Sequence, residues 1–336
     1  MLDWLISFPG FRLVLTTAKK VFGRVIRTGP TPKHIGIIMD GNRRYAMNHK
    51  IELKEGHNLG FESMASILEL LYESGIECAT VFAFSIENFK RLKYEVKWLM
   101  DLAKLKFMQI SQHGELCEEF GVKVKILGNI SLLPKDVQDI LKQTEEMSKN
   151  NTRAVLNVCF PYTSRDEIVT LMKRVVEESL TDPNIAIDEN AINQHLFTSD
   201  VPPLELLVRT SGTYRLSDFL LWQSVSSNCS IVFVDKLWPE FTPWDMAKIL
   251  IDWGFNTYWY GSGNGPMTRK DLTPRTQKSV SLLEKNGSTG FEHYESDHEY
   301  LEDDENYDEI DDSDAGTDEI NTVTSDDVPD ILKKSP

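Results

Sequence analysis

The segment HIGIIMDGNRR, residues 34–44, contains the residue types that most directly suggest chemistry. A run of apolar residues ends near one carboxylate, Asp40, and two adjacent arginines, Arg43 and Arg44, follow it. The planar guanidinium group suits phosphate oxygens, so the arginines predict a highly anionic ligand. Such a ligand would repel Asp40 unless a cation lay between them. Magnesium is commonly held by one or two carboxylates plus substrate phosphates, so the segment predicts a Mg²⁺ and phosphate site at Asp40.

Arginine follows an apolar run at two other places. The stretches FSIENFKR (84–91) and RTSGTYRLSDF (209–219) each carry arginine together with hydroxyl or amide side chains. Taken alone, an aspartate before arginine at a strand end is equally well explained by a helix cap with an ion pair. Three such segments together favour a shared anion site. The arginines at or just after predicted strand ends are Arg43, Arg44, Arg91, Arg209 and Arg215.

Short apolar runs rich in β-branched residues alternate with segments of helical periodicity along the chain. The runs occupy residues 34–39, 78–84, 122–127, 154–160, 204–210 and 231–235. This alternation predicts an α/β fold, a single domain with a mostly parallel six-stranded sheet covered by helices. In such sheets ligands bind at the carboxyl ends of the strands, where helix N-termini offer free N–H groups. We therefore expect the three polar segments to face one site.

Composition divides the chain into three parts. The formal net charge of −16 comes from the C-terminal region, because 18 carboxylates lie between residues 292 and 330 and residues 1–285 are formally neutral. We expect a basic amphipathic segment at 1–29, one α/β domain at 30–260, and a linker with an acidic disordered tail at 261–336. A neutral body and an acidic tail argue against nucleic-acid binding.

The N-terminal 29 residues combine apolar and basic side chains. Pro9-Gly10 and the basic residues interrupt the apolar run, so the segment matches neither a cleaved signal nor a membrane span. Two alternatives remain, a helix lying on an anionic membrane surface and a helix packed on the body or on a partner. The four cysteines show no CxxC pair and no zinc-like spacing, so we expect reduced thiols in a cytosolic environment.

Several long motifs carry a resemblance to a known family. They are HIGIIMDGNRRYA, EGHNLGF, TVFAFSIENFKR, LNVCFPYTSRDEI, RTSGTYRLSDFLLWQ and LWPEF, in that order. Over about residues 30–257 the chain resembles the cis-prenyltransferase family, and within it the eukaryotic dehydrodolichyl diphosphate synthase catalytic subunits. The bacterial undecaprenyl diphosphate synthases are similar, but they typically have Gly at the position of Arg43 and Trp at the position of Phe89.

The resemblance implies a prenyl-transferring enzyme of the ditrans,polycis-polyprenyl diphosphate synthase type. Such an enzyme condenses isopentenyl diphosphate units onto an allylic starter such as farnesyl diphosphate, with Mg²⁺, and forms a cis double bond at each step. The expected product is a long-chain dehydrodolichyl diphosphate for dolichol synthesis and protein glycosylation. The main alternative is a non-catalytic prenyl diphosphate-binding subunit of the same fold, although such subunits lack the aspartate and arginine set that this chain keeps.

The resemblance also implies roles for individual residues. Asp40 would hold the metal and act in catalysis, and Asn88 would assist proton loss after carbon–carbon bond formation. The remaining predicted substrate-binding residues fall into groups. The allylic diphosphate would be held by Gly41, Asn42, Arg43, Arg44 and Arg91; isopentenyl diphosphate by Arg209, Arg215 and Ser217; His57 and Ser85 would lie beside the substrates, and Phe89 would contact the prenyl chain. Residues 57–73 and 94–119 each have an apolar stripe that suits either the wall of a product tunnel or plain core.

Two departures from the family pattern predict a partner. Homomeric members end with an Arg-x-Gly segment that completes a neighbouring active site, and no such segment follows LWPEF here. Bacterial enzymes also carry a metal-assisting Glu where this chain reads SSNCS (226–230). We therefore expect a heteromer with a membrane-bound accessory subunit of the Nogo-B receptor type. The expected location is peripheral, on the cytosolic face of the endoplasmic reticulum membrane, with lipid droplets as a second candidate surface.

A further rival class is a phosphatase-like hydrolase, because a strand that ends in MDG also occurs in aspartyl-phosphate enzymes. Those enzymes need a second carboxylate two residues after the first to protonate a leaving group. This chain has Asn42 at that position, so the hydrolase fits less well.

Overall fold

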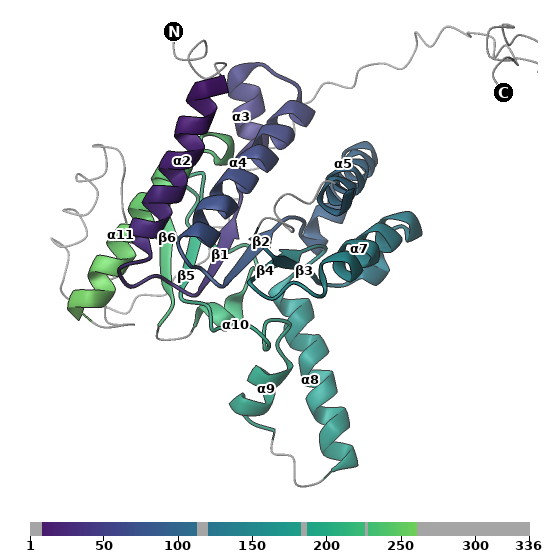
Figure 1. The fold of residues 1–336 in the computed structure, drawn as a ribbon. Helices are drawn as coiled ribbons and strands as arrows, with labels where there is room; N and C mark the ends of the chain where they lie inside the picture. The colour runs from purple at the N-terminus through teal and green to yellow at the C-terminus, as the bar shows by residue number, and fades with distance from the viewer. Residues whose placement is uncertain (1–8, 113–119, 183–186, 226–227, 261–336) are drawn as a thin grey trace, which may run out of the picture. The chain divides into compact units, whose positions relative to one another are not determined.

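The computed structural model describes residues 9–112, 120–182, 187–225 and 228–260 (Figure 1). The predicted acidic tail at 261–336 lies outside these residues. The described residues form a six-stranded sheet in which every pairing is parallel. Its strands are β1 (His34–Ile38), β2 (Cys78–Phe82), β3 (Val122–Leu127), β4 (Ala154–Cys159), β5 (Leu206–Arg209) and β6 (Ser230–Phe233). The predicted α/β fold is confirmed, and the strands begin or end within two residues of the predicted runs.

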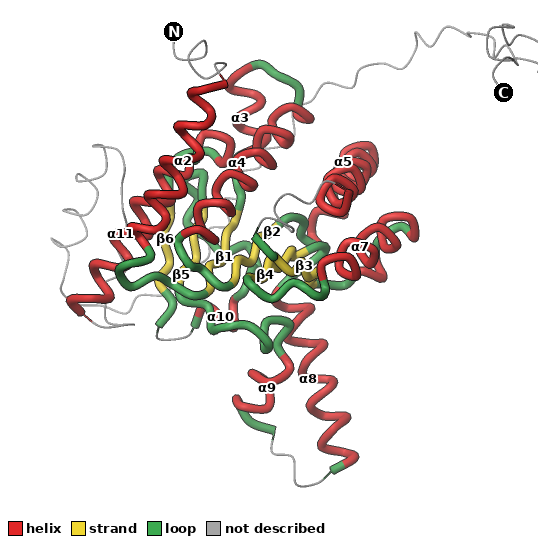
Figure 2. The backbone as a smooth tube through the Cα atoms, in the orientation of Figure 1, coloured by secondary structure: helices red, strands yellow, loops and turns green. Residues whose placement is uncertain are grey.

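Helices cover the sheet, as the tube in Figure 2 shows. They are α2 (Pro9–Ile26), α3 (Asn42–His49), α4 (Leu53–Glu73), α5 (Lys93–Gln112), α7 (Lys135–Ser148), α8 (Ser164–Thr181), α9 (Glu189–His195), α10 (Leu221–Ser224) and α11 (Pro243–Tyr260). Short 3-10 turns occur at η1 (Ile86–Lys90), η2 (Ile130–Leu132) and η3 (Trp238–Glu240). The helices α2, α4 and α11 pack against one another, α5 packs against α7, and α8 packs against α9 below the sheet in Figure 1.

Alternation of side chains along the strands places a hydrophobic cluster on each face of the sheet. On one face Ile35 and Ile37 belong to the larger cluster, which includes Leu68 and Leu71 of α4. On the other face Ile38 belongs to a smaller cluster with Leu207, Phe219 and Leu220. Because both faces of β1 are covered, all five of its residues are buried, which explains its continuous apolar sequence.

Helix α2 packs on the body of the protein, which is one of the two alternatives for the N-terminal segment. Pro9 and Gly10 do not interrupt the helix but begin it, as a proline in the first turn can. Lys19 pairs with Glu69 of α4. The ring of Phe22 meets that of Trp244 in α11, with centroids 5.3 Å apart. Among the described helices, none combines the length and the apolar character needed to cross a bilayer.

The strand order is β3-β4-β2-β1-β5-β6. The chain therefore starts near the middle of the sheet at β1, adds β2 beside it, crosses to the edge strand β3, and inserts β4 between β3 and β2. It then returns to the other side of β1 with β5 and β6. Such a reversal leaves a crevice at the carboxyl ends of the two strands that flank it, where ligands of α/β sheets usually bind. The three polar segments of the sequence follow β1, β2 and β5, so the topology brings them to this edge.

A buried histidine ties three strands together. His34 is fully buried in β1 and lies 2.7 Å from the carbonyl oxygen of Pro202, so its Nδ1 must donate there. Its Nε2 then accepts from the hydroxyl of Thr80 in β2 at 2.7 Å, and Thr80 accepts from the amide of Asn157 in β4 at 3.1 Å. Burial lowers the pKa of His34 to about 4, because a charged imidazolium would be poorly solvated there.

This network predicts that the folded state loses stability in mild acid. His34 has a folded pKa of about 4 against an ordinary value of 6.5, so its contribution is complete above pH 6.5 and is lost as the pH falls towards 4. The loss attributable to His34 should be roughly 3 kcal/mol between pH 7 and pH 4. Denaturant unfolding at several pH values measures it.

Two variants distinguish the loss of stability caused by protonation of His34 from the loss caused by protonation of other groups in acid. His34→Leu should be less stable at pH 7, because Thr80 and Pro202 lose a partner, but should show a shallower decline with acid. Replacing the exposed His49 by Gln should leave the wild-type decline unchanged. An equal decline in wild type and His34→Leu would contradict the assignment.

Candidate functional site

The site is centred on an ion pair between the ends of two neighbouring strands. Arg209 is the last residue of β5, is only 2% exposed, and lies beside Ile38 of β1 in the sheet. Its Nη2 donates to Asp40 Oδ2 at 2.7 Å. Its Nη1 donates to the carbonyl oxygen of Arg215 at 2.5 Å and to the hydroxyl of Ser217 at 2.7 Å. The structure thus brings together predicted residues from the first and the fifth strand ends.

The surroundings of Asp40 favour its charged form. Burial alone would raise the pKa of the carboxyl group, but hydrogen bonds with Ser211 and Arg209 and the charges of Arg209 and Arg44 lower it below its usual value. Its side chain is 33% exposed, so part of the carboxylate can be reached from outside. Asp40 is therefore an anionic, accessible oxygen donor at neutral pH.

Backbone hydrogen bonds fix the position of Asp40. The hydroxyl of Thr210 donates to the carbonyl oxygen of Asp40 at 2.8 Å and accepts from its N–H at 3.1 Å. The N–H of Trp238, which is 1% exposed, donates to the same carbonyl oxygen at 3.0 Å. Thr210, Ser211 and Trp238 were not predicted as site residues. The RTSG stretch held a signal for the first two, since it follows a strand end.

Helix α3 begins directly after Asp40 and presents its N-terminus to the site. Its N-cap is Gly41, with φ 110°, and no side chain caps the first N–H groups. A Cβ on Gly41 would lie 2.9 Å from Leu237 Cδ2, so both the backbone conformation and the packing require glycine. Asn42 Oδ1 is buried without a hydrogen-bond partner. Uncapped N–H groups and the helix dipole together suit an anion.

The remaining arginines surround this N-terminus. Arg44 is 51% exposed, and its Nη2 lies 3.8 Å from Asp40 Oδ2. Arg91 donates to Glu95 at 2.8 Å, and Arg43 lies 3.9 Å from the same carboxylate oxygen. Glu95 was missed by the sequence reasoning, and its only local signal is the spacing of four residues from Arg91. It holds two predicted ligand-binding arginines close to each other.

Ser85 and Asn88 contact each other at the end of β2. The N–H of Ser85 donates to Asn88 Oδ1 at 2.9 Å, and the hydroxyl of Ser85 accepts from the N–H of Glu87 at 3.2 Å, which caps η1. The side-chain carbonyl oxygen of Asn88 therefore already accepts a hydrogen bond from Ser85, and the side-chain NH₂ group remains as a donor. Phe89 packs its ring edge-on against Phe84, with centroids 5.1 Å apart.

His57 lies in α4 beside the arginines. Burial, together with the charges of Arg91 and Arg43, lowers its pKa to about 4. Its ring meets Trp98 of α5 with centroids 5.3 Å apart. His57 is consequently neutral at pH 7 and could accept or donate a hydrogen bond there.

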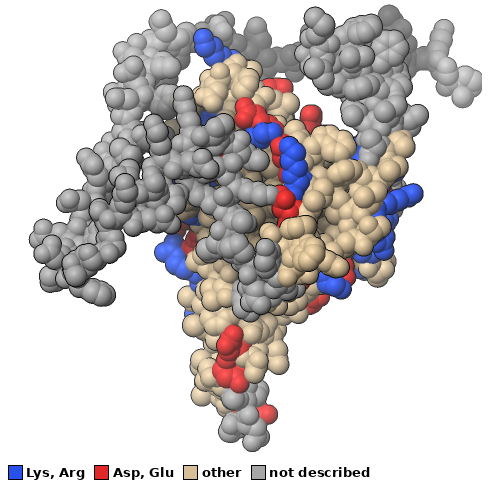
Figure 3. Space-filling view, turned by 90° about the vertical axis from the view of Figure 1, so that its left-hand side faces the viewer, with Lys and Arg blue, Asp and Glu red and all other residues tan. Residues whose placement is uncertain are grey.

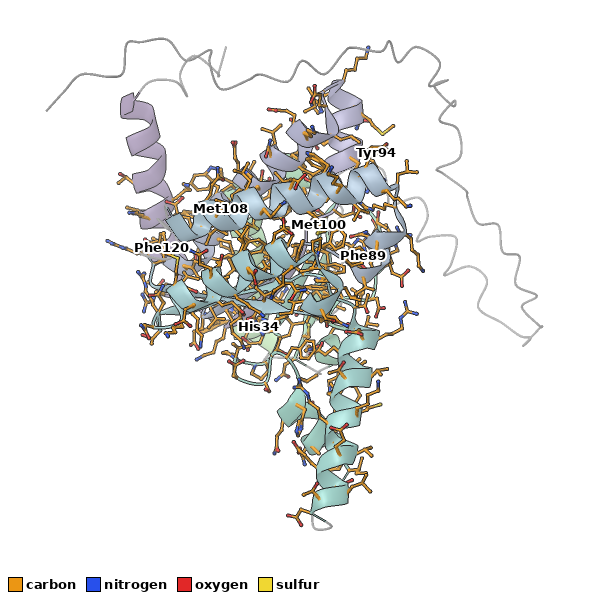
Figure 4. The ribbon with its side chains drawn as sticks, turned by 90° about the vertical axis from the view of Figure 1, so that its right-hand side faces the viewer. His34, Phe89, Tyr94, Met100, Met108 and Phe120 are labelled. Atoms are coloured by element: carbon orange, nitrogen blue, oxygen red, sulfur yellow. The ribbon has the colours of Figure 1, made fainter. Side chains whose placement is uncertain are left out.

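Parts of both predicted tunnel walls belong to the hydrophobic core. Met100 of α5 is buried in the same hydrophobic cluster as Met64 of α4, and Phe89 packs against that cluster. Figure 4 shows Tyr94, Met100 and Met108 along α5, with Phe89 near the N-terminal end of that helix. Residues 113–119 of the second wall lie outside the described part of the chain. Met100 and Met64 are thus plain core in this structure.

The donor set fits a magnesium ion brought by a phosphate ligand. Among the described residues, no three His, Cys, Asp or Glu side chains gather in a way that could hold a metal by themselves. Asp40 offers a single anionic oxygen donor, and Mg²⁺ commonly takes one or two carboxylates and completes its shell with water and substrate phosphates. Arg209 Nε is buried without a partner, which adds an unused donor to the same place.

The chain is similar to known proteins in both sequence and fold. A family model described as "Putative undecaprenyl diphosphate synthase" matches residues 38–261. A dehydrodolichyl diphosphate synthase complex subunit of Schizosaccharomyces pombe is 42% identical over 253 residues, covering 74% of this chain and 95% of the relative. A human subunit with the same description is 43% identical over 245 residues, covering 72% of this chain and 73% of the relative. The crystal structure of lavandulyl diphosphate synthase from Lavandula x intermedia, in complex with dimethylallyl diphosphate, superposes with a TM-score of 0.61 at 30% identity, covering 66% of this chain and 95% of that one.

The close packing of Gly41 against Leu237 predicts that the stability of the fold is sensitive to substitution at this position. Gly41→Ala places a methyl group against Leu237 in a backbone conformation that non-glycine residues rarely adopt, and should destabilise the fold by about 1–3 kcal/mol. Thermal or denaturant unfolding measures the change. Gly29→Ala is the matched control. A Cβ on Gly29 would lie 3.7 Å from its nearest neighbour, the Ile26 carbonyl oxygen, and the φ of Gly29 is not positive. Equal stability of the two variants would contradict the assignment.

Proposed function

Because the chain belongs to the cis-prenyltransferase family and is a prenyltransferase, we propose that it makes long-chain dehydrodolichyl diphosphate. It would condense isopentenyl diphosphate units onto farnesyl diphosphate in a Mg²⁺-dependent reaction that supplies dolichol synthesis and protein glycosylation. The observation that carries this proposal is the Asp40–Arg209 pair at the point where the strand order reverses, next to an uncapped helix N-terminus. A non-catalytic subunit of the same fold would be expected to lack this aspartate and arginine set.

The first half of the site suits the allylic diphosphate. The free N–H groups at the start of α3, together with Arg44 and Arg91, would bind its oxygens. As the allylic carbon–oxygen bond breaks, negative charge accumulates on the departing diphosphate. Donors that are already in place stabilise this charge without reorganisation, which lowers the barrier. Asp40 would hold Mg²⁺ on this diphosphate, and the ion would neutralise part of the same charge.

The second half suits isopentenyl diphosphate. Arg209, Arg215 and Ser217 converge through the hydrogen bonds of Arg209 and would orient its double bond towards the allylic carbon. The new carbon–carbon bond forms as diphosphate leaves, and the isopentenyl unit then loses a proton from its second carbon. We assign this proton to an oxygen of the departing diphosphate, with the NH₂ group of Asn88 positioning that oxygen, because the Asn88 carbonyl is already occupied.

We further propose that the enzyme works as a heteromer. Two relatives are described as subunits of a dehydrodolichyl diphosphate synthase complex, and this chain lacks an Arg-x-Gly segment after LWPEF. Helix α8 also presents an apolar stripe to solvent. The side chains of this stripe are 45–80% exposed and recur every three or four residues along the helix: Val169, Met172, Val176 and Leu180. A stripe of this kind is typical of a helix that meets a partner.

The proposed partner is a membrane-bound accessory subunit of the Nogo-B receptor type, which would donate the missing arginine and glycine. The chain itself would then be peripheral, on the cytosolic face of the endoplasmic reticulum or on lipid droplets. Charged side chains of both signs are interspersed among the described residues on the face in Figure 3, so no broad basic surface for nucleic acid is visible there. In this arrangement residues 30–260 would be the catalytic domain and 261–336 an accessory tail.

The chemistry is tested by replacing the metal-binding carboxylate. Asp40→Asn keeps an oxygen acceptor for Arg209 but removes the charge, so incorporation of labelled isopentenyl diphosphate onto farnesyl diphosphate should fall at least a hundredfold. The assay contains Mg²⁺ and the accessory subunit. Asp200→Asn, which removes an exposed carboxylate paired with Lys125, is the control and should keep wild-type activity. Near-normal activity of Asp40→Asn would contradict the proposed role of Asp40 in holding Mg²⁺.

The heteromer is tested at the stripe of α8. Val176→Asp together with Leu180→Asp should abolish co-purification with the accessory subunit and remove most activity, while circular dichroism and the melting temperature stay unchanged, since both side chains are exposed. The control is Glu177→Gln on the same helix, which leaves the apolar stripe intact and should keep partner binding. Full activity of the wild-type chain alone would show that no partner is needed.

A further inference from the structure

The loop between β5 and α10 is held in an unusual conformation. Ser217, Asp218 and Leu220 have φ values of 50°, 61° and 46°, in the left-handed region that costs non-glycine residues free energy. The same loop supplies the Ser217 hydroxyl and the Arg215 carbonyl oxygen that accept from buried Arg209. Such a conformation persists only where the surrounding structure holds it, so the contacts of this loop identify its support.

The support is the first turn of α8, which lies beside α10 in Figure 1. The N–H of Ser164 donates to the carbonyl oxygen of Asp218 at 2.8 Å, and the Ser164 hydroxyl accepts from the N–H of Leu221 at 2.8 Å. Arg165 adds two bonds to the Asp218 carboxylate, from its N–H at 3.1 Å and from Nε at 2.6 Å. One helical turn therefore holds the loop at Asp218 and at its exit into α10.

The buried carboxylate of Glu167 joins the first turn of α8 to α10 through hydrogen bonds. Its side chain is almost completely buried, with 1% of the residue exposed. It accepts from the hydroxyl of Tyr162 at 2.5 Å, from the N–H of Phe197 at 2.8 Å and from Nε2 of Gln223 in α10 at 3.2 Å. None of these groups lies among the predicted substrate-binding residues. A buried carboxylate with this many donors is costly to disturb, because each donor would lose its partner.

We propose that residues 164–167 form a clamp that positions the loop of Arg215 and Ser217, with Glu167 as its buried positioning residue. The clamp rests on the proposed function, because its consequence is accurate binding of isopentenyl diphosphate. If the loop relaxed, Arg209 would lose two acceptors in a place where its charge cannot be solvated, and the diphosphate site would widen. No described hydrogen bond joins residues 164–167 directly to α3, where the allylic diphosphate would bind, so the clamp reaches that side only through the loop, by way of Arg209 to Asp40 and Thr213 to Arg44.

The test uses Glu167→Gln in the full-length chain with its accessory subunit. An amide places an NH₂ group among donors, so the loop should loosen and the KM for isopentenyl diphosphate should rise about tenfold, the loss expected from one or two buried hydrogen bonds. The KM for farnesyl diphosphate should change less than twofold. Ser164→Ala, a milder change that removes the acceptor for the Leu221 N–H and the 3.2 Å contact with the Tyr162 hydroxyl, should shift the same KM by about threefold.

Val175→Ala is the matched control, because it removes buried contacts from the same helix without touching the loop. It should lower the melting temperature and leave both KM values unchanged. Equal KM shifts for the two substrates, or the same shift in Val175→Ala, would overturn the clamp.

A readout independent of activity separates the clamp from the proposed function. Hydrogen exchange of the amides at 213–221 should be faster in Glu167→Gln than in wild type and Val175→Ala, whether or not the assay detects condensation. Unchanged exchange in this loop overturns the clamp. If exchange is faster but wild type makes no product, the clamp stands and the assigned substrates are wrong.

Discussion

The structure depends on the buried charge of Arg209. Moving a guanidinium group out of water costs several kcal/mol unless an opposite charge and further acceptors surround it. Here Asp40 supplies the charge, and the loop after β5 supplies two neutral acceptors, the Arg215 carbonyl and the Ser217 hydroxyl. These partners come from two separate segments of the chain. The arginine can be buried only when the loop after β1 and the loop after β5 are both in place.

The same charge makes the site receptive to anions. One carboxylate, Asp40, faces Arg209 and Arg44, while Arg43 and Arg91 share Glu95. The arginines therefore keep an excess of positive charge next to the positive end of the α3 dipole. A diphosphate with a bound metal ion would complete this balance, which is why the residues that stabilise the fold at this edge also suit the transfer of a prenyl group from its diphosphate.

The precision of the site comes from groups that do not face the ligand. The N–H of Trp238 and the hydroxyl of Thr210 fix the backbone of Asp40, and Leu237 leaves room for nothing larger than glycine at Gly41. On the other side the first turn of α8 fixes the loop of Ser217. The chemistry thus takes place between two supported loops, and each support holds the backbone of its loop at a fixed place in the site.

The sequence by itself determined the six strands, the parallel sheet and the polar residues at three strand ends, because apolar periodicity and strand length are local properties of the chain. It did not determine that β5 returns beside β1, which is what pairs Arg209 with Asp40. Tertiary structure alone decided that Arg43 joins Arg91 at Glu95, that α2 packs on α4, and that Glu167 lies under the loop of Ser217. These contacts join residues whose side chains meet only after the elements have packed, and a hydrogen bond between distant segments leaves no periodic trace in either one.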